Sequence, residues 1–177
     1  MRIISGSLGG REFKSPAGHR THPMSDKIRG AVFNMLGDIT GLTVLDAFAG
    51  SGALSLEAIS RGAAHATAID IDKSACSTIH QNIAQLDIQD KVKVSCANCV
   101  RWSLKNQAKR FDLIICDPPY DKVHIAVIQK LSRLLADNAL LVLSWPGHLP
   151  TPDIDGLTHV QGKHYNDAQL IFYRKMV

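Results

Sequence analysis

A short motif that combines a carboxylate, two prolines and an aromatic ring stands in the second half of the chain. It reads Asp117-Pro118-Pro119-Tyr120 and follows an apolar stretch at residues 111–116. Two consecutive prolines fix φ and remove backbone donors, but their carbonyl oxygens remain as acceptors. Such a turn would present Asp117 and a proline carbonyl to a ligand, with Tyr120 as a flat stacking face for a base. The alternative interpretation is a purely structural turn.

A glycine-rich turn occurs earlier, where the chain runs Asp46-Ala47-Phe48-Ala49-Gly50-Ser51-Gly52 after another apolar stretch. Glycines at such a turn let a ligand approach the backbone closely. A dinucleotide fingerprint would need a third glycine near Ser55, and Asp46 would repel a pyrophosphate. The ammonium group of an amino acid would instead be attracted by Asp46. The turn therefore favours S-adenosylmethionine over a dinucleotide as the cofactor.

Two further polar residues follow the next two expected strands. Asp70 lies roughly 20 residues after the glycine turn, where a carboxylate that binds a ribose diol is expected. Asp72 competes for this role, but it is better placed to cap the following helix. The alternative is that Asp70 and Asp72 both act only as helix caps. Asn98 has an amide that can pair with the edge of adenine, although such a residue is more often a helix cap.

Apolar stretches of strand length alternate with amphipathic stretches of helix length after Gly41. The expected strands are 42–46, 66–70, 92–96, 111–116 and 139–145. The expected helices are 52–61, 73–86, 98–109 and 121–136. This alternation predicts an α/β fold with a doubly wound, mostly parallel sheet. The tips of neighbouring strands would then bring the glycine turn and the Asp-Pro-Pro-Tyr motif together.

Both ends of the chain depart from this alternation. Residues 2–15 are expected to form a short hairpin around Gly9-Gly10, 16–24 a loop, and the following residues a helix capped by Ser25 and ending near Leu36. Residues 157–164 and 168–174 are expected to form an antiparallel hairpin. We therefore divide the chain into an N-terminal extension, 1–24, and a cofactor-binding domain, 25–177.

The positive charge of the protein is concentrated near its start. The whole chain has a net charge of +4, from 20 Lys and Arg against 16 Asp and Glu. The first 30 residues hold six of those cations against Glu12 and Asp26, which accounts for all of the net charge. This distribution is typical of a catalytic domain with a phosphate-contacting arm, although an ordinary solvated basic face is the alternative. The predicted RNA-binding residues are Arg2, Arg11, Lys14, Arg20, His22, Lys27 and Arg29.

The composition is that of a soluble globular protein, with 45% hydrophobic and 20% charged residues in a chain of 177. No apolar run approaches the roughly 20 residues that span a bilayer, and the start has no secretory h-region. We therefore expect a cytoplasmic protein that has no membrane contact. Cys96 and Cys99 form a CxxC pair, but Cys76 and Cys116 are isolated, so we expect no metal site and mostly buried cysteines.

Several stretches of the sequence resemble one known family. DPPY after the fourth expected strand, with DxFxGxG after the first, resembles the amino-group methyltransferases of DNA and RNA. From end to end, the chain is similar to the RsmD family of bacterial 16S rRNA guanine-N2 methyltransferases. This resemblance is carried by RIISGSLGGREF, SDKIRGAVFN, LDAFAGSGALSLEAISRGA, AIDID, FDLIICDPPY and KHYNDAQLIFYR. It implies a Rossmann-like class I methyltransferase fold, S-adenosylmethionine as cofactor, and 16S rRNA in the small ribosomal subunit or its assembly intermediate as partner. We expect a monomer.

The resemblance also implies roles for individual residues. The glycine turn would line the methionine end of the cofactor, Asp70 would hold its ribose and Asn98 its adenine. The predicted cofactor-binding residues are Asp46, Phe48, Ala49, Gly50, Ser51, Gly52, Asp70, Ile71, Asn98 and Cys99. Asp117 and the Pro118 carbonyl would bind the target amino group, and Tyr120 would stack on a flipped guanine. The predicted catalytic residues are Asp117, Pro118, Pro119 and Tyr120.

The chain departs from the family pattern at two places. His22-Pro23-Met24 stands where the family often has Arg-Pro-Thr, which leaves the role of His22 open. Asn166 stands where most relatives have glycine, and asparagine tolerates a positive φ.

Three rival functions share parts of these patterns. A DNA adenine or cytosine amino methyltransferase uses the same motif, but no stretch here is long enough for a separate recognition domain. A non-catalytic RNA-binding protein on the same fold would not need the intact glycine turn. A nicotinamide oxidoreductase is disfavoured by the missing third glycine.

Overall fold

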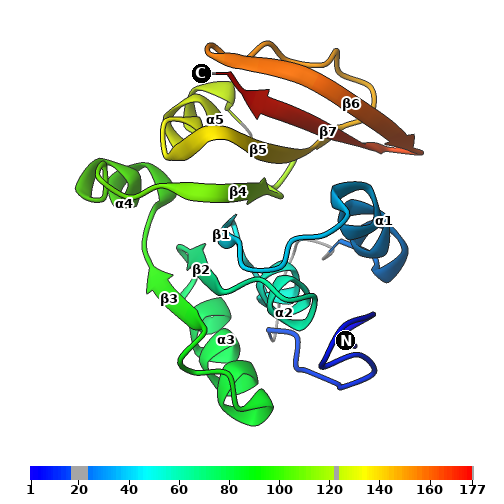
Figure 1. Ribbon diagram of the computed structural model, residues 1–177, viewed down its shortest axis with the longest axis vertical. Coiled ribbons are helices and arrows are strands. Elements are labelled where there is room, and N and C mark those ends of the chain that lie inside the picture. The colour runs from blue at the N-terminus through cyan, green and yellow to red at the C-terminus, as the bar shows by residue number, and fades with distance from the viewer. Residues whose placement is uncertain (17–23, 122–123, 177) are drawn as a thin grey trace.

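A single mixed sheet forms the centre of the protein in the computed structural model, which describes residues 1–16, 24–121 and 124–176 (Figure 1). Within these residues seven strands are hydrogen-bonded in the order β3-β2-β1-β4-β5-β7-β6. The strands are β1 (Thr43–Ala47), β2 (His65–Asp70), β3 (Val92–Cys96), β4 (Phe111–Cys116), β5 (Leu135–Pro146), β6 (Leu157–Tyr165) and β7 (Ala168–Lys175). The helices are α1 (Asp26–Leu36), α2 (Ala53–Ser60), α3 (Lys73–Leu86), α4 (Cys99–Lys105) and α5 (Ile125–Ser132). Strands β1 to β5 pair in parallel, and β7 pairs antiparallel with β5 and β6, which confirms the expected fold class.

The strand order changes direction at β1, which lies between β2 and β4. In open α/β sheets, ligands bind at such a switch point, outside the carboxyl ends of the strands. The register places Ala47 of β1 opposite both Ile69 of β2 and Cys116 of β4. Asp70 and Asp117 are the next residues along the two neighbouring strands. The sheet therefore brings the glycine turn, Asp70 and Asp117 to one edge.

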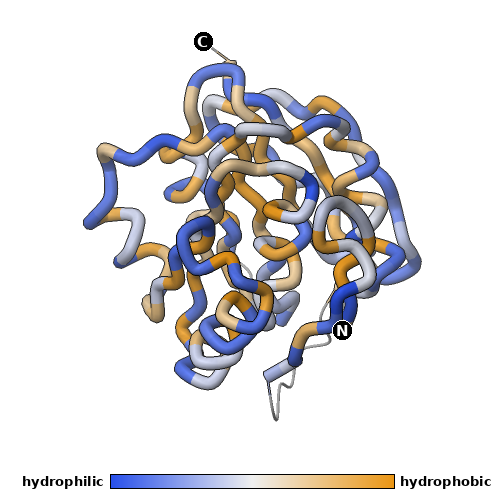
Figure 2. The backbone as a smooth tube through the Cα atoms, turned by 60° about the horizontal axis from the view of Figure 1, so that its bottom comes forward, coloured by the Kyte–Doolittle hydropathy of each residue, from blue (hydrophilic) through white to orange (hydrophobic). Residues whose placement is uncertain are grey.

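Helices cover both faces of the sheet and bury an apolar layer against each. One core contains Phe33 of α1, Leu56 of α2 and Ile79 of α3, and the other contains Trp102 of α4 and Leu131 of α5. Figure 2 shows hydrophobic stretches of the chain in the interior and hydrophilic ones around the outside. Among the described residues, no helix is long and apolar enough to cross a membrane.

Every residue of α2 is buried, because the N-terminal segment covers the side of α2 that faces away from the sheet. Glu57 of α2 accepts hydrogen bonds from the backbone N–H groups of Ile4 (2.8 Å) and Ser5 (3.2 Å). The segment also crosses the end of α2 at Gly6, where a Cβ would lie 1.8 Å from the carbonyl oxygen of Ser60. Only glycine permits this approach, since any side chain would push the segment off the helix.

The expected N-terminal hairpin at 2–15 forms as a short antiparallel pairing with a single bridge, between Arg2 and Glu12. Backbone N–H groups of Ile3 and Phe13 donate across it to the carbonyls of Arg11 (3.0 Å) and Met1 (3.0 Å). Other backbone donors of the segment bond to side chains of the main domain. Besides the two bonds to Glu57, the backbone N–H of Lys14 donates to Asn82 Oδ1 (2.9 Å), and Asn82 Nδ2 donates back to the carbonyl of Lys14 (2.9 Å). The boundary expected at residue 24 adjoins 17–23, which lie outside the described residues, and it remains a prediction.

Two expected helices are shorter in the structure. The helix expected at 98–109 ends at Lys105, and the one expected at 121–136 is α5, Ile125–Ser132. The strand expected at 139–145 begins earlier, at Leu135, which pairs with Phe111 of β4 before the register shifts. Asn138 has a φ of 63° within β5 and marks this irregularity. The short apolar run Leu134-Leu135-Ala136 fits the end of a helix and the start of a buried strand equally well, so pattern alone misplaced the boundary.

The prediction that Arg29 contacts RNA is wrong, because its side chain is fully buried. The guanidinium of Arg29 donates to the carbonyl of Arg2 (2.5 Å) and pairs with Asp26 (3.0 Å) and, more distantly, with Glu57 (3.6 Å). Glu57 also accepts from Arg61 Nε (2.7 Å). A buried charge needs such partners, because desolvation makes an unpaired charge costly. Arg29 therefore holds the N-terminal segment against α1 and α2.

Replacing Glu57 by alanine is expected to destabilise the protein by about 3–5 kcal/mol, because the buried Arg29 loses a counter-charge and two backbone amides lose their acceptor. Urea unfolding followed by circular dichroism measures this change. The matched control is Glu12→Ala, which removes an exposed carboxylate from its 3.4 Å pair with Arg2 and should change stability little. Equal stabilities of the two variants would contradict a central role for Glu57.

Candidate active site

Three predicted carboxylates meet at the carboxyl edge of the sheet. Asp46 belongs to β1, Asp70 ends β2, and Asp117 follows β4 directly. The three are close enough that the charges of Asp117 and Asp70 both raise the pKa of Asp46. Asp117 therefore lies beside the glycine turn rather than in a distant part of the fold.

The glycine turn is held in an unusual backbone conformation. Phe48, Gly50 and Gly52 all have a positive φ, of 67°, 54° and 79°. A Cβ at Gly52 would lie 3.1 Å from Cγ1 of Ile79 on α3, so the turn packs closely against that helix. A positive φ in a phenylalanine is strained, and such strain tends to occur at functional sites. The glycines predicted this turn from the sequence, but no residue pattern predicted the positive φ of Phe48.

Asp46 is a fully buried carboxylate with one oxygen left unpartnered. Its Oδ2 accepts from the backbone N–H (3.0 Å) and the hydroxyl (2.7 Å) of Ser55, whereas Oδ1 is buried with no hydrogen-bond partner. Burial raises the pKa of Asp46 to about 7, against the effect of the bonds from Ser55. A cation placed against Oδ1 would satisfy this oxygen and favour the ionised form. The residues present therefore fit a ligand that carries an ammonium group.

Asp70 fastens the glycine turn to β2. Its Oδ2 accepts from the backbone N–H of Gly50 (2.8 Å), and its Oδ1 accepts from that of Asp72 (2.9 Å). Asp72 caps α3 by accepting from the N–H of Ser74 (2.7 Å), as the sequence favoured. A carboxylate has about four lone-pair sites, so Asp70 can still accept from a diol. Ile71 is 69% exposed beside it and offers an apolar surface to a ligand.

Asn98 is the N-cap of α4, the alternative raised for it from sequence. Its Oδ1 accepts from the backbone N–H groups of Val100 (3.0 Å) and Arg101 (3.2 Å). Only its amide nitrogen is then available as a donor to a ligand, so the expected contact with adenine stays a prediction. Cys99 is buried, and burial raises the pKa of its thiol to about 11, so it packs as an apolar side chain. Cys96, in contrast, is exposed.

The Asp-Pro-Pro-Tyr corner is tied to the neighbouring strand through Ser144, a residue that sequence analysis missed. The hydroxyl of Tyr120 hydrogen-bonds to Oγ of Ser144 (2.8 Å), which lies on β5. Burial raises the pKa of Asp117 to about 6, and a hydrogen bond from Ser144 opposes this rise. Tyr120 is 37% exposed, so part of its ring is free to contact a ligand. A lone serine in an apolar strand was the only available signal for Ser144.

Comparison with known proteins identifies the family. The family model described as "Conserved hypothetical protein 95" matches residues 1–174. The protein named "Ribosomal RNA small subunit methyltransferase D" of Escherichia coli (strain K12) is 34% identical over 142 residues, which cover 80% of this chain and 69% of the relative. The chain belongs to the RsmD family.

Members of the family match over nearly the whole chain. The Bacillus subtilis protein YlbH is 33% identical over 183 residues, with 99% of each chain covered. The solved structure of the Escherichia coli protein YhhF has 30% identity and a TM-score of 0.88, with 99% of this chain and 98% of that chain covered. The fold is therefore the Rossmann-like fold of class I methyltransferases, as the sequence predicted.

Some of the predicted RNA-binding cations are engaged by protein groups, whereas others are exposed. Arg11 donates to the carbonyl of Gln85 (3.1 Å) at the end of α3, and Arg2 pairs with Glu12 (3.4 Å). Lys14 and Lys27 are exposed. Arg20 and His22 lie outside the described residues. Among the residues that the structure describes, Lys14 and Lys27 are the cations whose exposure best fits the predicted RNA-binding role.

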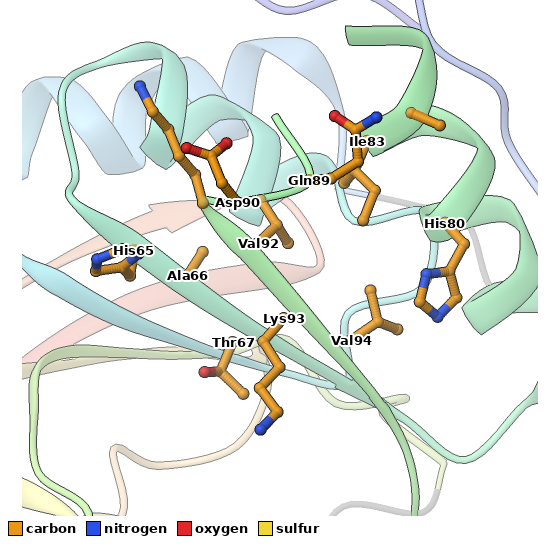
Figure 3. A pocket seen from close by; sticks show the side chains of 12 residues that line it. His65, Ala66, Thr67, His80, Ile83, Gln89, Asp90, Val92, Lys93 and Val94 are labelled. Atoms are coloured by element: carbon orange, nitrogen blue, oxygen red, sulfur yellow. The ribbon is translucent and has the colours of Figure 1, made fainter. Parts of the chain in front are cut away.

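A groove of about 740 Å³ lies away from this edge, at the amino ends of β2 and β3 (Figure 3). His65 and Lys93 border it from these strands, and His80 borders it from α3. None of the predicted site residues lines this groove. The groove is therefore separate from the carboxylate edge, and the sequence did not predict it.

The raised pKa of Asp46 makes a prediction about stability without ligand. Its folded pKa of about 7 lies above the ordinary value of 3.8, so the folded state binds more protons than the unfolded state between these values. The free energy of unfolding should then fall as pH rises from about 4 to about 7. Asp117, with a pKa of about 6, contributes to the same fall.

Asp46→Asn should make this dependence shallower, as measured by urea unfolding at a series of pH values. Asp90→Asn, at an exposed position, is the control and should leave the dependence unchanged. Coinciding curves for the wild type and Asp46→Asn would show that Asp46 is not the titrating group.

Proposed function

We propose that the chain transfers the methyl group of S-adenosylmethionine to the exocyclic N2 amino group of a guanine in 16S rRNA. The observation that carries this proposal is the unpartnered Oδ1 of the buried Asp46 beside the Asp117–Tyr120 corner at one edge of the sheet. Membership of the RsmD family supports it. Two relatives that align with this chain over two thirds or more of their length carry the name "Ribosomal RNA small subunit methyltransferase D". The names of these relatives also support the broader function of an rRNA methyltransferase.

The cofactor would be held by the residues around the glycine turn. Asp46 would bind the ammonium group, because this pairing satisfies Oδ1 and favours the ionised carboxylate. The backbone of Ala49, Gly50 and Gly52 would lie along the methionine end, and Asp70 would accept from the ribose hydroxyls. Phe48, Ser51, Ile71, Asn98 and Cys99 complete the proposed site. When bound, the cofactor supplies a methyl group on a positively charged sulfur.

The Asp-Pro-Pro-Tyr corner would hold the target base. The Asp117 carboxylate and the Pro118 carbonyl can each accept one N–H of an exocyclic amino group, and Pro119 keeps the turn rigid. These two acceptors favour a nitrogen whose lone pair faces the methyl donor, so alignment supplies much of the rate. With a pKa of about 6, Asp117 is mostly ionised at neutral pH. Its carboxylate can therefore accept a hydrogen bond from the amino group and can take up the proton that the amino group loses.

The target base must leave its stack to reach this corner. Unstacking costs a few kcal/mol, and this cost is least for an unpaired nucleotide. The exposed part of the Tyr120 ring would stack on the flipped guanine and recover part of that energy. The proposed partner is 16S rRNA in the small subunit or an assembly intermediate, with the enzyme acting in the cytoplasm as a monomer.

The decisive experiment has two parts. Calorimetry should show binding of S-adenosylmethionine and no binding of NAD. Mass spectrometry of nucleosides from the rRNA of a deletion strain should show that one N2-methylguanine is missing, and a gene copy should restore it. Loss of a methylated adenine or cytosine from DNA would overturn the proposal in favour of a DNA amino methyltransferase.

Asp117→Ala should abolish methylation of small-subunit rRNA while calorimetry still detects binding of S-adenosylmethionine, because the proposed cofactor contacts lie on β1, β2 and α4. Asp121→Ala, an exposed carboxylate four residues later, is the control and should retain activity. Loss of cofactor binding together with activity in Asp117→Ala would make Asp117 a structural residue.

Lys14→Ala combined with Lys27→Ala should weaken RNA binding and lower the slope of log affinity against log salt by about 1 for each phosphate that the double variant no longer binds. This pair is preferred to one with Arg11, because Arg11 also bonds to the end of α3. Filter binding at several salt concentrations measures the slope. Lys105→Ala with Lys109→Ala, at the end of α4, should leave the slope unchanged. An equal effect of both pairs would remove Lys14 and Lys27 from the RNA interface.

A further inference from the structure

Ser144 occupies a place where its hydroxyl needs an explanation. It lies near the end of β5, is 4% exposed, and follows the apolar run Leu140–Leu143. A buried hydroxyl costs free energy unless it is hydrogen-bonded. The structure shows one partner, the hydroxyl of Tyr120 at 2.8 Å. The Asp-Pro-Pro-Tyr corner therefore supplies the partner that this buried hydroxyl needs.

The strand register brings Ser144 to Asp117 as well. Cys116 of β4 pairs with Leu143 of β5, so Asp117 and Ser144 are the next residues on two neighbouring strands. The Ser144 hydroxyl is close enough to Asp117 to lower its pKa. One side chain therefore bonds to the tyrosine of the motif and lies beside its carboxylate.

The number of available protons sets the direction of these hydrogen bonds. A serine hydroxyl donates one hydrogen bond and accepts others, whereas an ionised carboxylate only accepts. Burial raises the pKa of Tyr120, so its phenol keeps its proton at neutral pH. Tyr120 then donates to Ser144, which leaves the Ser144 proton available to the neighbouring Asp117 carboxylate.

We propose that Ser144 is a positioning residue that links the Tyr120 ring to the Asp117 carboxylate and sets both relative to the target base. This inference rests on the proposed function. Through Ser144, the group that stacks on the base and the group that accepts from its amino nitrogen are held as one unit. Reactions that depend on alignment lose rate when such a unit loosens, even if each group is still present.

Other ionisable groups face this unit, and their protonation states must stay constant in the test. Asp46 faces Asp117 from β1, Cys116 precedes it on β4, and Asp167, in the turn between β6 and β7, acts on Tyr120. Activity measured with saturating S-adenosylmethionine keeps Asp46 paired, so its titration does not enter the profile. Cys116 has a pKa raised well above its ordinary value and stays neutral.

The test compares Ser144→Ala, Ser144→Thr and Tyr120→Phe with the wild type across pH, using small-subunit rRNA. We expect Ser144→Ala to lower kcat by about tenfold, the effect of losing one hydrogen bond to a charged group. Its affinity for S-adenosylmethionine should be unchanged. The acid limb of the kcat profile should move up by roughly half a unit to one unit, because the bond that stabilises ionised Asp117 is lost. Ser144→Thr should restore the wild-type midpoint, and Tyr120→Phe should lower kcat while moving the midpoint less than Ser144→Ala.

The matched control is Ser132→Ala. Ser132 is also 4% exposed, but its hydroxyl donates to the carbonyl of Gln129 within α5. Both alanine variants lose one buried hydroxyl, so a purely structural role for Ser144 predicts equal kcat values and equal pH profiles. That result would overturn the proposal.

A second measurement separates failure of this proposal from failure of the proposed function. The carboxyl carbon of Asp117, followed by NMR in carbon-labelled protein, should titrate at a higher pH in Ser144→Ala than in the wild type. An unchanged titration with normal rRNA methylation overturns the role of Ser144 alone. A wild-type protein that does not methylate rRNA overturns the proposed function and, with it, the role of Ser144 in positioning a base.

Discussion

The parallel register of β1 between β2 and β4 is the constraint on which the candidate site depends. Because Ala47 pairs with both Ile69 and Cys116, Asp46 beside it on β1 lies at the same edge as Asp70 and Asp117, the next residues on β2 and β4. Like charges at such an edge repel one another, and the protein offsets this repulsion with donors from three directions. Ser55 serves Asp46, the backbone of Gly50 serves Asp70, and Ser144 serves Asp117. The sheet and these donors together form the site.

The N-terminal segment is part of the same structure and not an appended arm. Ile3 and Phe13 belong to a hydrophobic core that they share with α1, α2 and α3, and Glu57 and Asn82 bind backbone groups of the segment. The segment thus closes the outer side of α2, the helix whose Ser55 supports Asp46. Changes in the segment can therefore reach the site through α2 without touching a ligand.

Much of the fold was predictable because the alternation of strand and helix patterns is a local property of the sequence. The capping role of Asp72 was predictable for the same reason, since a cap is recognised from its neighbours. The burial of Arg29 was not, because the groups that meet it, the carbonyl of Arg2 and the carboxylate of Glu57, come from distant parts of the sequence. Ser144 was missed because a serine in an apolar strand becomes informative only when the strand beside it is known. The backbone of Phe48 is likewise set by packing that no local pattern records.

The orphan oxygen of Asp46 couples ligand binding to the acidity of the solution. Near neutral pH the empty carboxyl group is partly protonated, since its pKa is about 7. An incoming cation can pair with it only after that hydrogen ion has been expelled. Association therefore releases a fraction of a proton to the buffer, and the measured heat depends on the ionisation enthalpy of the buffer chosen. Affinity should weaken on acidification even though the ligand itself keeps its charge.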